Sequence, residues 1–152
     1  MTLELKIPPV AVALVTGAWM WLAAWAVPGF DVPFPGQVVF SVMVALLGLC
    51  IALSGVVAFR RAGTTINPMK PGSLSSLVVA GIYSVTRNPM YLGVLLLLLA
   101  WAIYLANVLT VLFLPAFVWY MGRYQIEPEE QTLTSLFGPK YTAYAARVRR
   151  WI

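Results

Sequence analysis

Residues 90–121 read MYLGVLLLLLAWAIYLANVLTVLFLPAFVWYM, a run of 32 residues without a charged side chain. As one continuous α-helix this run would be about 48 Å long, whereas the hydrocarbon core of a bilayer is about 30 Å thick. A break near Ala106-Asn107 resolves the mismatch, because asparagine disfavours helix interiors and tolerates a left-handed turn. The run therefore predicts two membrane helices in a hairpin, at about 89–106 and 108–126.

Two further apolar segments precede this hairpin. Residues 8–27 and 38–59 carry no charge, and each is long enough to cross a membrane as a helix. The whole chain is 61% hydrophobic and 10% charged, with a mean hydropathy of +0.86, a composition typical of integral membrane proteins. We therefore expect an all-α, polytopic membrane protein with four transmembrane helices, folded as a single domain over residues 1–152.

The basic residues indicate how the helices are oriented. They lie at the N-terminus, in the connection at 60–88 and after the last span, whereas the connection around Asp31 contains none. Lysine and arginine concentrate in cytoplasmic loops, so the pattern places both termini in the cytoplasm and, in a bacterium, the protein in the inner membrane. The net charge of +5 is explained by contact with anionic membrane lipids, so we expect no binding to nucleic acid.

The segments that connect or follow the spans predict further short helices and turns. Residues 74–80 are moderately apolar and predict a short helix at the membrane interface. Pro128 disfavours a helical conformation at Glu127, so the fourth helix is expected to end there and a new helix to begin. A turn at Gly138-Pro139 should then lead into a short C-terminal helix that carries Tyr141.

Polar side chains gather in two places beside the apolar spans. The first is 81–93, GIYSVTRNPMYLG, and the second is 123–141, RYQIEPEEQTLTSLFGPKY. Carboxylates, arginines and tyrosine rings together are suited to a zwitterionic or cationic small molecule. The chain has no histidine, which excludes a histidine-based zinc site and a Ser-His-Asp triad, and it has neither GxGxxG nor a P-loop. We expect no metal site.

The motifs in these clusters resemble those of a known family. RNPMYLG at 87–93 is followed by the pattern PEExxLxxxFGxxYxxYxxRVxRW from 128 to 151. Together they resemble the isoprenylcysteine carboxyl methyltransferases, which are related to the phospholipid N-methyltransferases, and the resemblance covers residues 60–152. It implies an integral membrane enzyme that binds S-adenosylmethionine, and releases S-adenosylhomocysteine, in a pocket closed by the C-terminal helical segment. It also implies a lateral opening for a lipophilic substrate, with cofactor-binding elements at 60–88 and 127–152.

The same resemblance implies roles for individual residues. Those expected to hold the cofactor are Gly81, Ile82, Tyr83, Arg87, Asn88, Pro89, Tyr91, Glu130 and Tyr141, and those expected to be catalytic on the substrate side are Arg123, Glu127 and Glu129. Two positions depart from the family pattern. Asn88 stands where the family has histidine, and an asparagine side chain cannot carry a charge. Gln125 stands where the isoprenylcysteine enzymes have an arginine four residues before the first glutamate, while Arg123 precedes Glu127 by four.

The sequence leaves the methyl acceptor open between a carboxylate, an amine and a thiol. An amine would need a proton acceptor, for which Glu129 or Glu130 is the apparent candidate. Two other functions are kept as alternatives. One is a non-catalytic relative or assembly subunit that keeps the fold without turnover, and the other is a small transporter, which the lack of carboxylates in the four expected spans disfavours. The oligomeric state is also left open.

Overall fold

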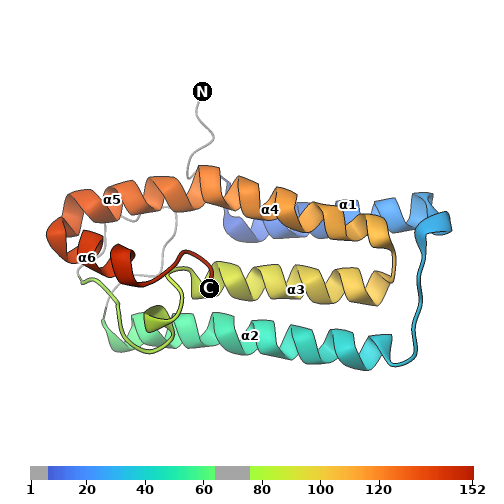
Figure 1. Cartoon of the computed structure of the whole chain (residues 1–152), viewed down its shortest axis with the longest axis horizontal. Helices are drawn as coiled ribbons and strands as arrows, with labels where there is room; N and C mark the ends of the chain where they lie inside the picture. Colours follow the sequence, from blue (N-terminus) through green and yellow to red (C-terminus); the bar gives the residue numbers. More distant parts are fainter. Residues whose placement is uncertain (1–6, 64–75) are drawn as a thin grey trace.

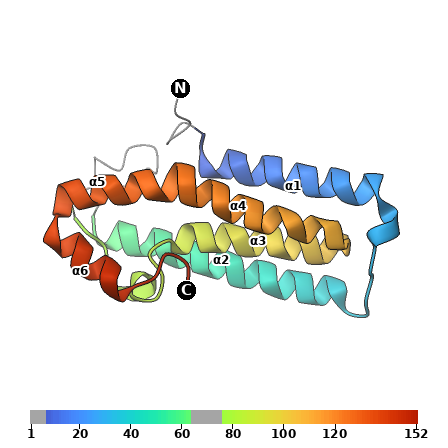
Figure 2. The same ribbon diagram turned by 45° about the horizontal axis from the view of Figure 1, so that its top comes forward.

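The computed structural model describes residues 7–63 and 76–152. Within these ranges the chain is helical, without β-strands, and long helical rods lie side by side along one direction (Figures 1 and 2). The first three rods are α1 (Pro9–Ala26), α2 (Gln37–Arg61) and α3 (Pro89–Leu105). The fourth joins η4 (Val108–Leu112), α4 (Phe113–Met121), the π-helical turn η5 (Gly122–Ile126) and α5 (Glu127–Phe137). The 3-10 turns η1 (Pro28–Phe30) and η3 (Gly81–Ser84) and the last helix α6 (Pro139–Arg147) complete the described elements, so the expected all-α class is confirmed.

Small residues allow α2 and α3 to pack closely. Gly48 of α2 faces Gly93 of α3, and a Cβ atom added at Gly93 would lie 2.5 Å from the Gly48 carbonyl oxygen. Further along the same interface, the Ser41 hydroxyl donates a 2.7 Å hydrogen bond to the Ala100 carbonyl oxygen. Close backbone approach and interhelical hydrogen bonds of this kind hold helices together in a membrane, where lipid removes the hydrophobic driving force. The pairing fixes the position of α3 and hence of its first turn, which bears Tyr91.

The break between α3 and the fourth rod lies where the sequence predicts it. Ala106 takes a φ of 51°, in the left-handed region, and the chain leaves the helix there. The buried Asn107 amide donates to the Val27 carbonyl oxygen at 3.0 Å and to the Asp31 carboxylate at 2.7 Å. The Val32 N–H donates to the Ala106 carbonyl oxygen at 2.6 Å. These bonds tie the α1–α2 connection to the α3–α4 connection at one end of the bundle.

The prediction that the fourth helix ends near Glu127 is wrong. Helix α4 passes through η5 directly into α5, and Figure 2 shows the result as one rod. A proline inside an α-helix lacks an N–H donor and clashes with the carbonyl group four residues earlier. The π turn just before Pro128 changes that spacing, and Pro128 lies in the first turn of α5, where a missing N–H is tolerated. The chain therefore continues as a helix past the proline.

The predicted C-terminal turn and helix are confirmed. Gly138 takes a φ of 49°, and the helix that follows, α6, folds back beside α5 (Figure 1). This reversal places the basic C-terminal residues near the start of α3.

The short helix expected over 74–80 is not seen in its described part. Residues 76–80 are not helical, and the 3-10 turn η3 follows them. The remainder of that prediction, together with the rest of the connection at 64–75, lies outside the described residues.

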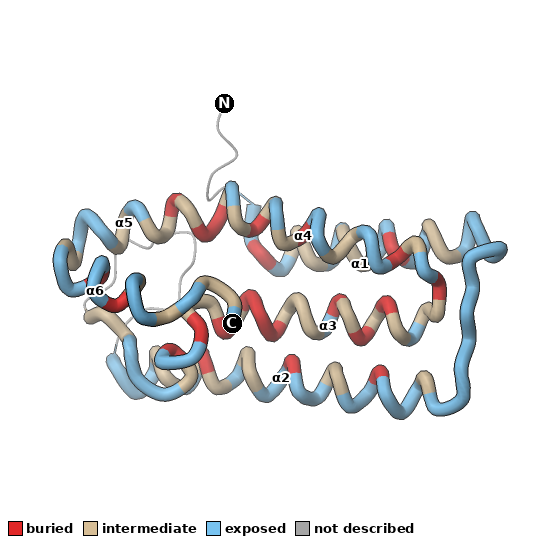
Figure 3. Tube along the Cα trace, in the orientation of Figure 1, coloured by how far each residue is buried: buried red, intermediate tan, exposed pale blue. Residues whose placement is uncertain are grey.

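The outside of the bundle is apolar. Helices α1 and α2 are long and apolar enough to cross a membrane, and α3 is a shorter apolar helix of 17 residues. In the apolar stretch of α1 only 11% of the residues are buried, and the share is the same in α2. Large side chains such as Leu14, Val39 and Leu46 point outward instead, and Figure 3 shows exposed residues along both helices. Exposed apolar surface of this extent indicates contact with lipid, so the protein associates with a membrane.

Candidate functional site

The polar site lies at the end of the bundle where α3 begins, opposite the Asn107 connection (Figure 1). Turn η3, the first turn of α3, the π turn η5, and helices α5 and α6 meet here. Residues 148–152, which we call the C-terminal strap, run back over this end and contact residues 86–88. The two polar clusters found in the sequence are thereby brought together.

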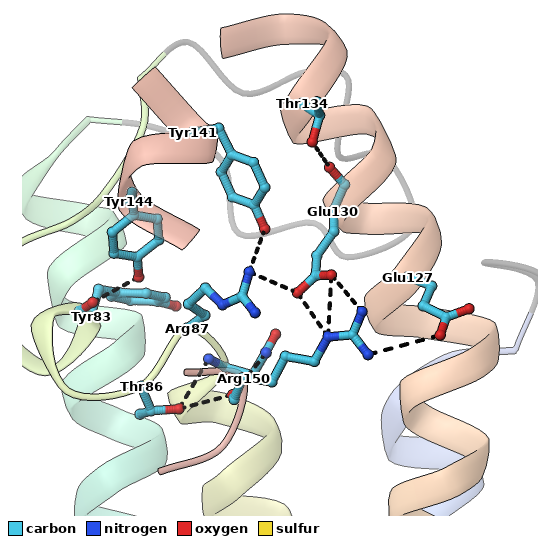
Figure 4. Close-up of polar contacts among 10 residues, drawn as sticks. Tyr83, Thr86, Arg87, Glu127, Glu130, Thr134, Tyr141, Tyr144 and Arg150 are labelled. Atoms are coloured by element: carbon cyan, nitrogen blue, oxygen red, sulfur yellow. Dashed lines mark hydrogen bonds and ion pairs between the residues drawn. The ribbon is translucent and has the colours of Figure 1, made fainter. Parts of the chain in front are cut away.

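Glu130 lies between two arginines. The Arg87 Nη1 atom is 3.1 Å from Glu130 Oε1, and the Arg150 Nη2 atom is 2.7 Å from Glu130 Oε2 (Figure 4). The Arg150 Nε atom also donates to both carboxylate oxygens, at 3.1 and 3.2 Å. Only 14% of the Arg87 side chain and 18% of the Glu130 side chain are exposed. Charged hydrogen bonds shielded from water are strong and directional, so Glu130 is held in one orientation by both partners.

The C-terminal strap is anchored to residues 86–88. The Arg87 N–H donates to the Arg149 carbonyl oxygen at 3.0 Å. The Thr86 hydroxyl and the Asn88 amide donate to the Arg150 carbonyl oxygen at 3.1 and 2.9 Å. Asn88 therefore acts here as a hydrogen-bond donor, a role that does not require a charged side chain. Sequence reasoning missed Thr86 and Arg150 as site residues. Arg150 belongs to the RVxRW pattern, but the pattern does not show where the strap folds back.

Glu129 has a different environment from Glu130. Its Oε1 atom accepts a 2.5 Å hydrogen bond from the Tyr91 hydroxyl, and within residues 7–63 and 76–152 no arginine or lysine pairs with it. Burial raises the pKa of Glu129 to about 8, and the charge of Glu130 adds to the rise while the Tyr91 hydrogen bond opposes it. This carboxyl group can therefore exchange a proton near neutral pH and, once ionised, attract a cation.

The turn expected on the cofactor side packs beneath α6. Gly81 takes a φ of 65°, which suits glycine, and the Ile82 carbonyl oxygen accepts the Thr86 N–H at 3.2 Å. Tyr83 is buried, and burial raises the pKa of its hydroxyl far above the usual range. Pro89 opens α3 and is also buried. Figure 4 shows Tyr83 beside Arg87 and Tyr144, so this turn borders the ion pairs of Glu130.

Two tyrosines of α6 cover the same side. The Tyr144 hydroxyl donates a 2.7 Å hydrogen bond to the Tyr83 carbonyl oxygen, and the Tyr141 hydroxyl accepts a 3.5 Å hydrogen bond from Arg87 (Figure 4). Burial raises the pKa of both Tyr141 and Tyr144 to about 12. Both hydroxyl groups therefore stay protonated at neutral pH and serve as hydrogen-bonding groups.

Arg123 and Glu127 lie at the rim of the site. The Arg123 Nη1 atom is 2.9 Å from Glu127 Oε2, and 53% and 36% of the two side chains are exposed. Glu127 Oε1 in turn lies 3.8 Å from Arg150 Nη1. The structure thus pairs Arg123 with Glu127, and it does not pair Arg123 with Glu129.

Gln125 is a buried polar residue that the predicted site did not include. It lies in the π turn η5, is 2% exposed and faces the Tyr91 hydroxyl. Its Nε2 atom has no hydrogen-bond partner in the described part of the chain. A π turn holds more residues than an α-helical turn and so changes the directions of the side chains. Arg123 is exposed while Gln125 is buried. The signal for Gln125 in the sequence was its position four residues before Glu129, where the isoprenylcysteine enzymes have an arginine.

Known proteins resemble this chain over the regions just described. The family model described as phospholipid methyltransferase matches residues 36–140. Protein-S-isoprenylcysteine O-methyltransferase B of Arabidopsis thaliana is 27% identical over 109 residues, which are 72% of this chain and 55% of the relative. Protein-S-isoprenylcysteine O-methyltransferase of Schizosaccharomyces pombe is 29% identical over 102 residues, which are 67% of this chain and 43% of the relative. An uncharacterized protein of Haemophilus influenzae is 44% identical over 63 residues, which are 41% of this chain and all of the relative. The chain spans about half the length of the isoprenylcysteine methyltransferases it matches.

Proposed function

The chain belongs to the phospholipid methyltransferase family, and from that premise we propose that it transfers a methyl group from S-adenosylmethionine to a lipophilic, membrane-associated acceptor. The family expected from the sequence motifs is confirmed by this match and by the similarity to isoprenylcysteine methyltransferases. The donor, the acceptor and the residue roles are the parts that we propose.

The contrast between the two neighbouring glutamates carries the proposal. Glu130 is paired with Arg87 and Arg150, whereas Glu129 lies half-buried beside Tyr91 and no arginine or lysine in the described ranges pairs with it. A carboxyl group in that position is suited to a sulfonium or ammonium cation, because such a ligand supplies the missing positive charge. S-adenosylmethionine supplies a methyl group bonded to a sulfonium sulfur.

The other groups of the site fit the remainder of such a cofactor. The Arg87 Nε atom is buried and has no hydrogen-bond partner in the described part of the chain, so it is available to a carboxylate oxygen. Tyr141 and Tyr83 both lie near Arg87 (Figure 4), and aromatic rings there would suit a flat or cationic group. We propose that the cofactor is held by Gly81, Ile82, Tyr83, Arg87, Asn88, Pro89, Tyr91, Glu130 and Tyr141. Because Arg150 pairs with Glu130, we propose it as a further member of this set.

We propose that Arg123, Glu127 and Glu129 are the catalytic residues on the acceptor side of the site. Transfer of a methyl group needs the nucleophile and the methyl carbon in line and water excluded. Glu129 and Tyr91 hold the buried side of this space, and Arg123 and Glu127 lie at its exposed rim. The strap, anchored through Asn88, covers the site, in keeping with a pocket closed by the C-terminal segment.

The acceptor is proposed to enter from the bilayer. A groove of about 630 Å³ lies between α1 and α3 and is lined by apolar side chains, among them Leu14, Trp21 and Trp101. Val94 also lines the groove and follows Tyr91 by three residues on α3, so the groove begins about one helical turn from the site. A hydrocarbon chain lying in this groove would bring its reactive end toward Tyr91.

We further propose four membrane spans in one domain, with both termini in the cytoplasm. The basic residues of the strap and of α6 then face anionic headgroups. Cysteine labelling tests this arrangement in a Cys50→Ala background, with single cysteines at the exposed positions Gly36 and Lys140. A membrane-impermeant reagent added outside should label position 36 only, and labelling of position 140 from outside would contradict the orientation.

Calorimetry with S-adenosylmethionine and the detergent-purified protein tests the proposed cofactor. Loss of a hydrogen bond to a charged group costs about 1.5–3 kcal/mol, so Glu130→Ala and Tyr91→Ala should each weaken binding by about ten- to hundred-fold. Tyr104→Ala, at the opposite end of α3, is the matched control and should leave the affinity unchanged. The proposal fails if the wild-type protein shows no binding.

A further inference from the structure

The C-terminal strap lies at the point where α3 enters the apolar part of the bundle. Carbonyl oxygens of the strap accept hydrogen bonds from residues 86–88, and α3 begins directly afterwards at Pro89. Trp151 of the strap packs against the apolar core of the bundle. Tryptophan is typical of the boundary between hydrocarbon and water, where the lipid headgroups also lie. The strap is therefore placed at the level of the headgroups of a surrounding membrane.

The extended backbone of the strap directs two neighbouring arginines to opposite sides. Val148 has extended torsion angles, with φ −117° and ψ 130°, and Arg149 forms a parallel bridge with Thr86. Successive side chains of an extended chain point to opposite faces. Arg150 points to Glu130 (Figure 4), so Arg149 points away from the site, and it is exposed. One arginine of the strap thus belongs to the site, and the residue before it faces the surroundings.

The outward-facing cations here have no acidic partner in the described part of the chain. Within residues 7–63 and 76–152, neither Arg147 nor Arg149 forms an ion pair. Arg147, the last residue of α6, donates a 3.3 Å hydrogen bond to the Ala143 carbonyl oxygen. The neighbouring carboxylates of Glu127 and Glu130 are paired with other arginines. Both outward-facing arginines are exposed and are therefore available to an anion from outside the protein.

We infer that Arg147 and Arg149 bind the phosphate groups of anionic membrane lipids and so hold the strap closed over the site. The inference rests on the proposed function, because it takes the site to be the cofactor site and the strap to lie at the cytoplasmic membrane surface. Each arginine that reaches such a surface adds about five-fold to the affinity. Arg150 directly follows Arg149, so a lipid that holds Arg149 also keeps Arg150 beside Glu130. Anionic lipid thereby regulates how tightly the cofactor is held.

The backbone amide of Arg87 reports whether the strap is closed, because its N–H group donates to the Arg149 carbonyl oxygen. Its hydrogen exchange is measured by mass spectrometry in nanodiscs of phosphatidylcholine alone, or of phosphatidylcholine and phosphatidylglycerol in equal parts. We expect exchange in the wild-type protein to be at least about ten-fold slower with the anionic lipid. Salt at about 1 M, which screens charges beyond about 3 Å, should remove most of this difference.

Two double variants remove the same charge from different places. Arg147→Gln with Arg149→Gln should show the same exchange rate in both kinds of nanodisc. Arg60→Gln with Arg61→Gln removes two exposed cations from the last turn of α2, outside the strap, and should keep the wild-type difference.

Calorimetry with S-adenosylhomocysteine in the same nanodiscs measures the effect on the site. The wild-type protein should bind this product several-fold more tightly with the anionic lipid than without it. The variant with Arg147→Gln and Arg149→Gln should bind it equally in both.

The possible results separate the lipid contact from the proposed function. Equal exchange of the wild type in both lipids overturns the inference, and so does a difference that persists in the Arg147→Gln, Arg149→Gln variant. Inorganic phosphate added to the neutral nanodiscs should not slow exchange, and an effect as large as that of the lipid would assign the arginines to a soluble anion instead. Slower exchange with an unchanged affinity for S-adenosylhomocysteine overturns the regulation of the site. Absence of S-adenosylhomocysteine binding in every lipid defeats the proposed function, whereas the exchange measurement uses no cofactor and still decides the lipid contact.

Discussion

The Tyr91 hydroxyl donates a hydrogen bond to the Glu129 carboxyl group and so joins the first turn of α3 to the first turn of α5. This bond lies next to the ion pairs of Glu130 but is separate from them. Two adjacent glutamates thereby differ in their chemistry, since one is paired with arginines and the other exchanges a proton near neutral pH.

The affinity for S-adenosylmethionine should depend on pH through Glu129. Burial raises the pKa of this carboxyl group to about 8, so it is mostly neutral at pH 6.5 and mostly ionised at pH 9. Only the ionised form attracts a sulfonium, and the affinity should therefore rise with pH across this window, by about ten-fold if binding lowers the pKa by one unit. Titrations at several pH values measure the slope. Glu129→Gln, which cannot ionise, should remove it, and an unchanged slope in that variant would assign the effect to another group.

Loss of the strap anchors should expose the C-terminus. Asn88→Ala and Thr86→Ala each remove a donor to the Arg150 carbonyl oxygen, so the strap should open more often. Limited trypsin digestion should then cut at Arg147 and Arg149 several-fold faster than in the wild type. Thr142→Ala, which removes an exposed hydroxyl on α6, is the control and should digest at the wild-type rate. Equal rates in all variants would show that these two bonds do not hold the strap.

The α2–α3 interface should not tolerate a methyl group at Gly93. The added Cβ would lie 2.5 Å from the Gly48 carbonyl oxygen and 2.7 Å from the Ala52 Cβ atom. Overpacking of a tight interface costs about 1–3 kcal/mol, so Gly93→Ala should lower the unfolding temperature in detergent. Gly122→Ala is a matched control, because a Cβ there meets nothing within 4 Å. Similar unfolding temperatures for both variants would contradict the close packing.

Substitutions of Arg150 and Arg123 should differ in their effects on product binding and on methyl transfer. Arg150 pairs with the half-buried Glu130, and Arg150→Ala should weaken binding of S-adenosylhomocysteine by about ten-fold. Arg123 makes only an exposed ion pair, so Arg123→Ala should bind this product nearly normally. If Arg123 positions the acceptor, as we propose, its loss should nevertheless slow methyl transfer, because a small misplacement of a reactant can cost about a hundred-fold in rate. Normal turnover in Arg123→Ala would remove Arg123 from the acceptor site.

Much of the fold could be predicted because hydropathy and helix breakers act locally. The ends of α1, α2 and α3 follow from uncharged stretches of membrane length, and the break at Asn107 follows from the backbone preference of asparagine. The ordered pair of polar motifs also predicted that residues 87–91 and 127–130 lie together. These residues carry most of the described ion pairs of the site.

The rest depended on geometry that a local pattern does not contain. The rule for Pro128 predicted a helix end, but a π turn lets the helix continue, and such a turn has no sequence signature. The same turn decides that Gln125 is buried and Arg123 exposed, whereas sequence reasoning favoured Arg123. Arg150 joins the site only because the strap returns to residues 86–88, a contact between segments about sixty residues apart in the chain.

The most direct test of the account is methyl transfer by the purified protein itself. The wild-type protein, in detergent with a total lipid extract, is incubated with S-adenosylmethionine labelled in its methyl group, and label is counted in the organic phase. We predict that label enters the lipid fraction with the wild type and falls by at least about a hundred-fold with Glu129→Gln, which keeps the shape of the side chain but cannot accept a proton. Binding of S-adenosylmethionine without any transfer of label by the wild type would contradict the account and would indicate a relative that keeps the fold without turnover.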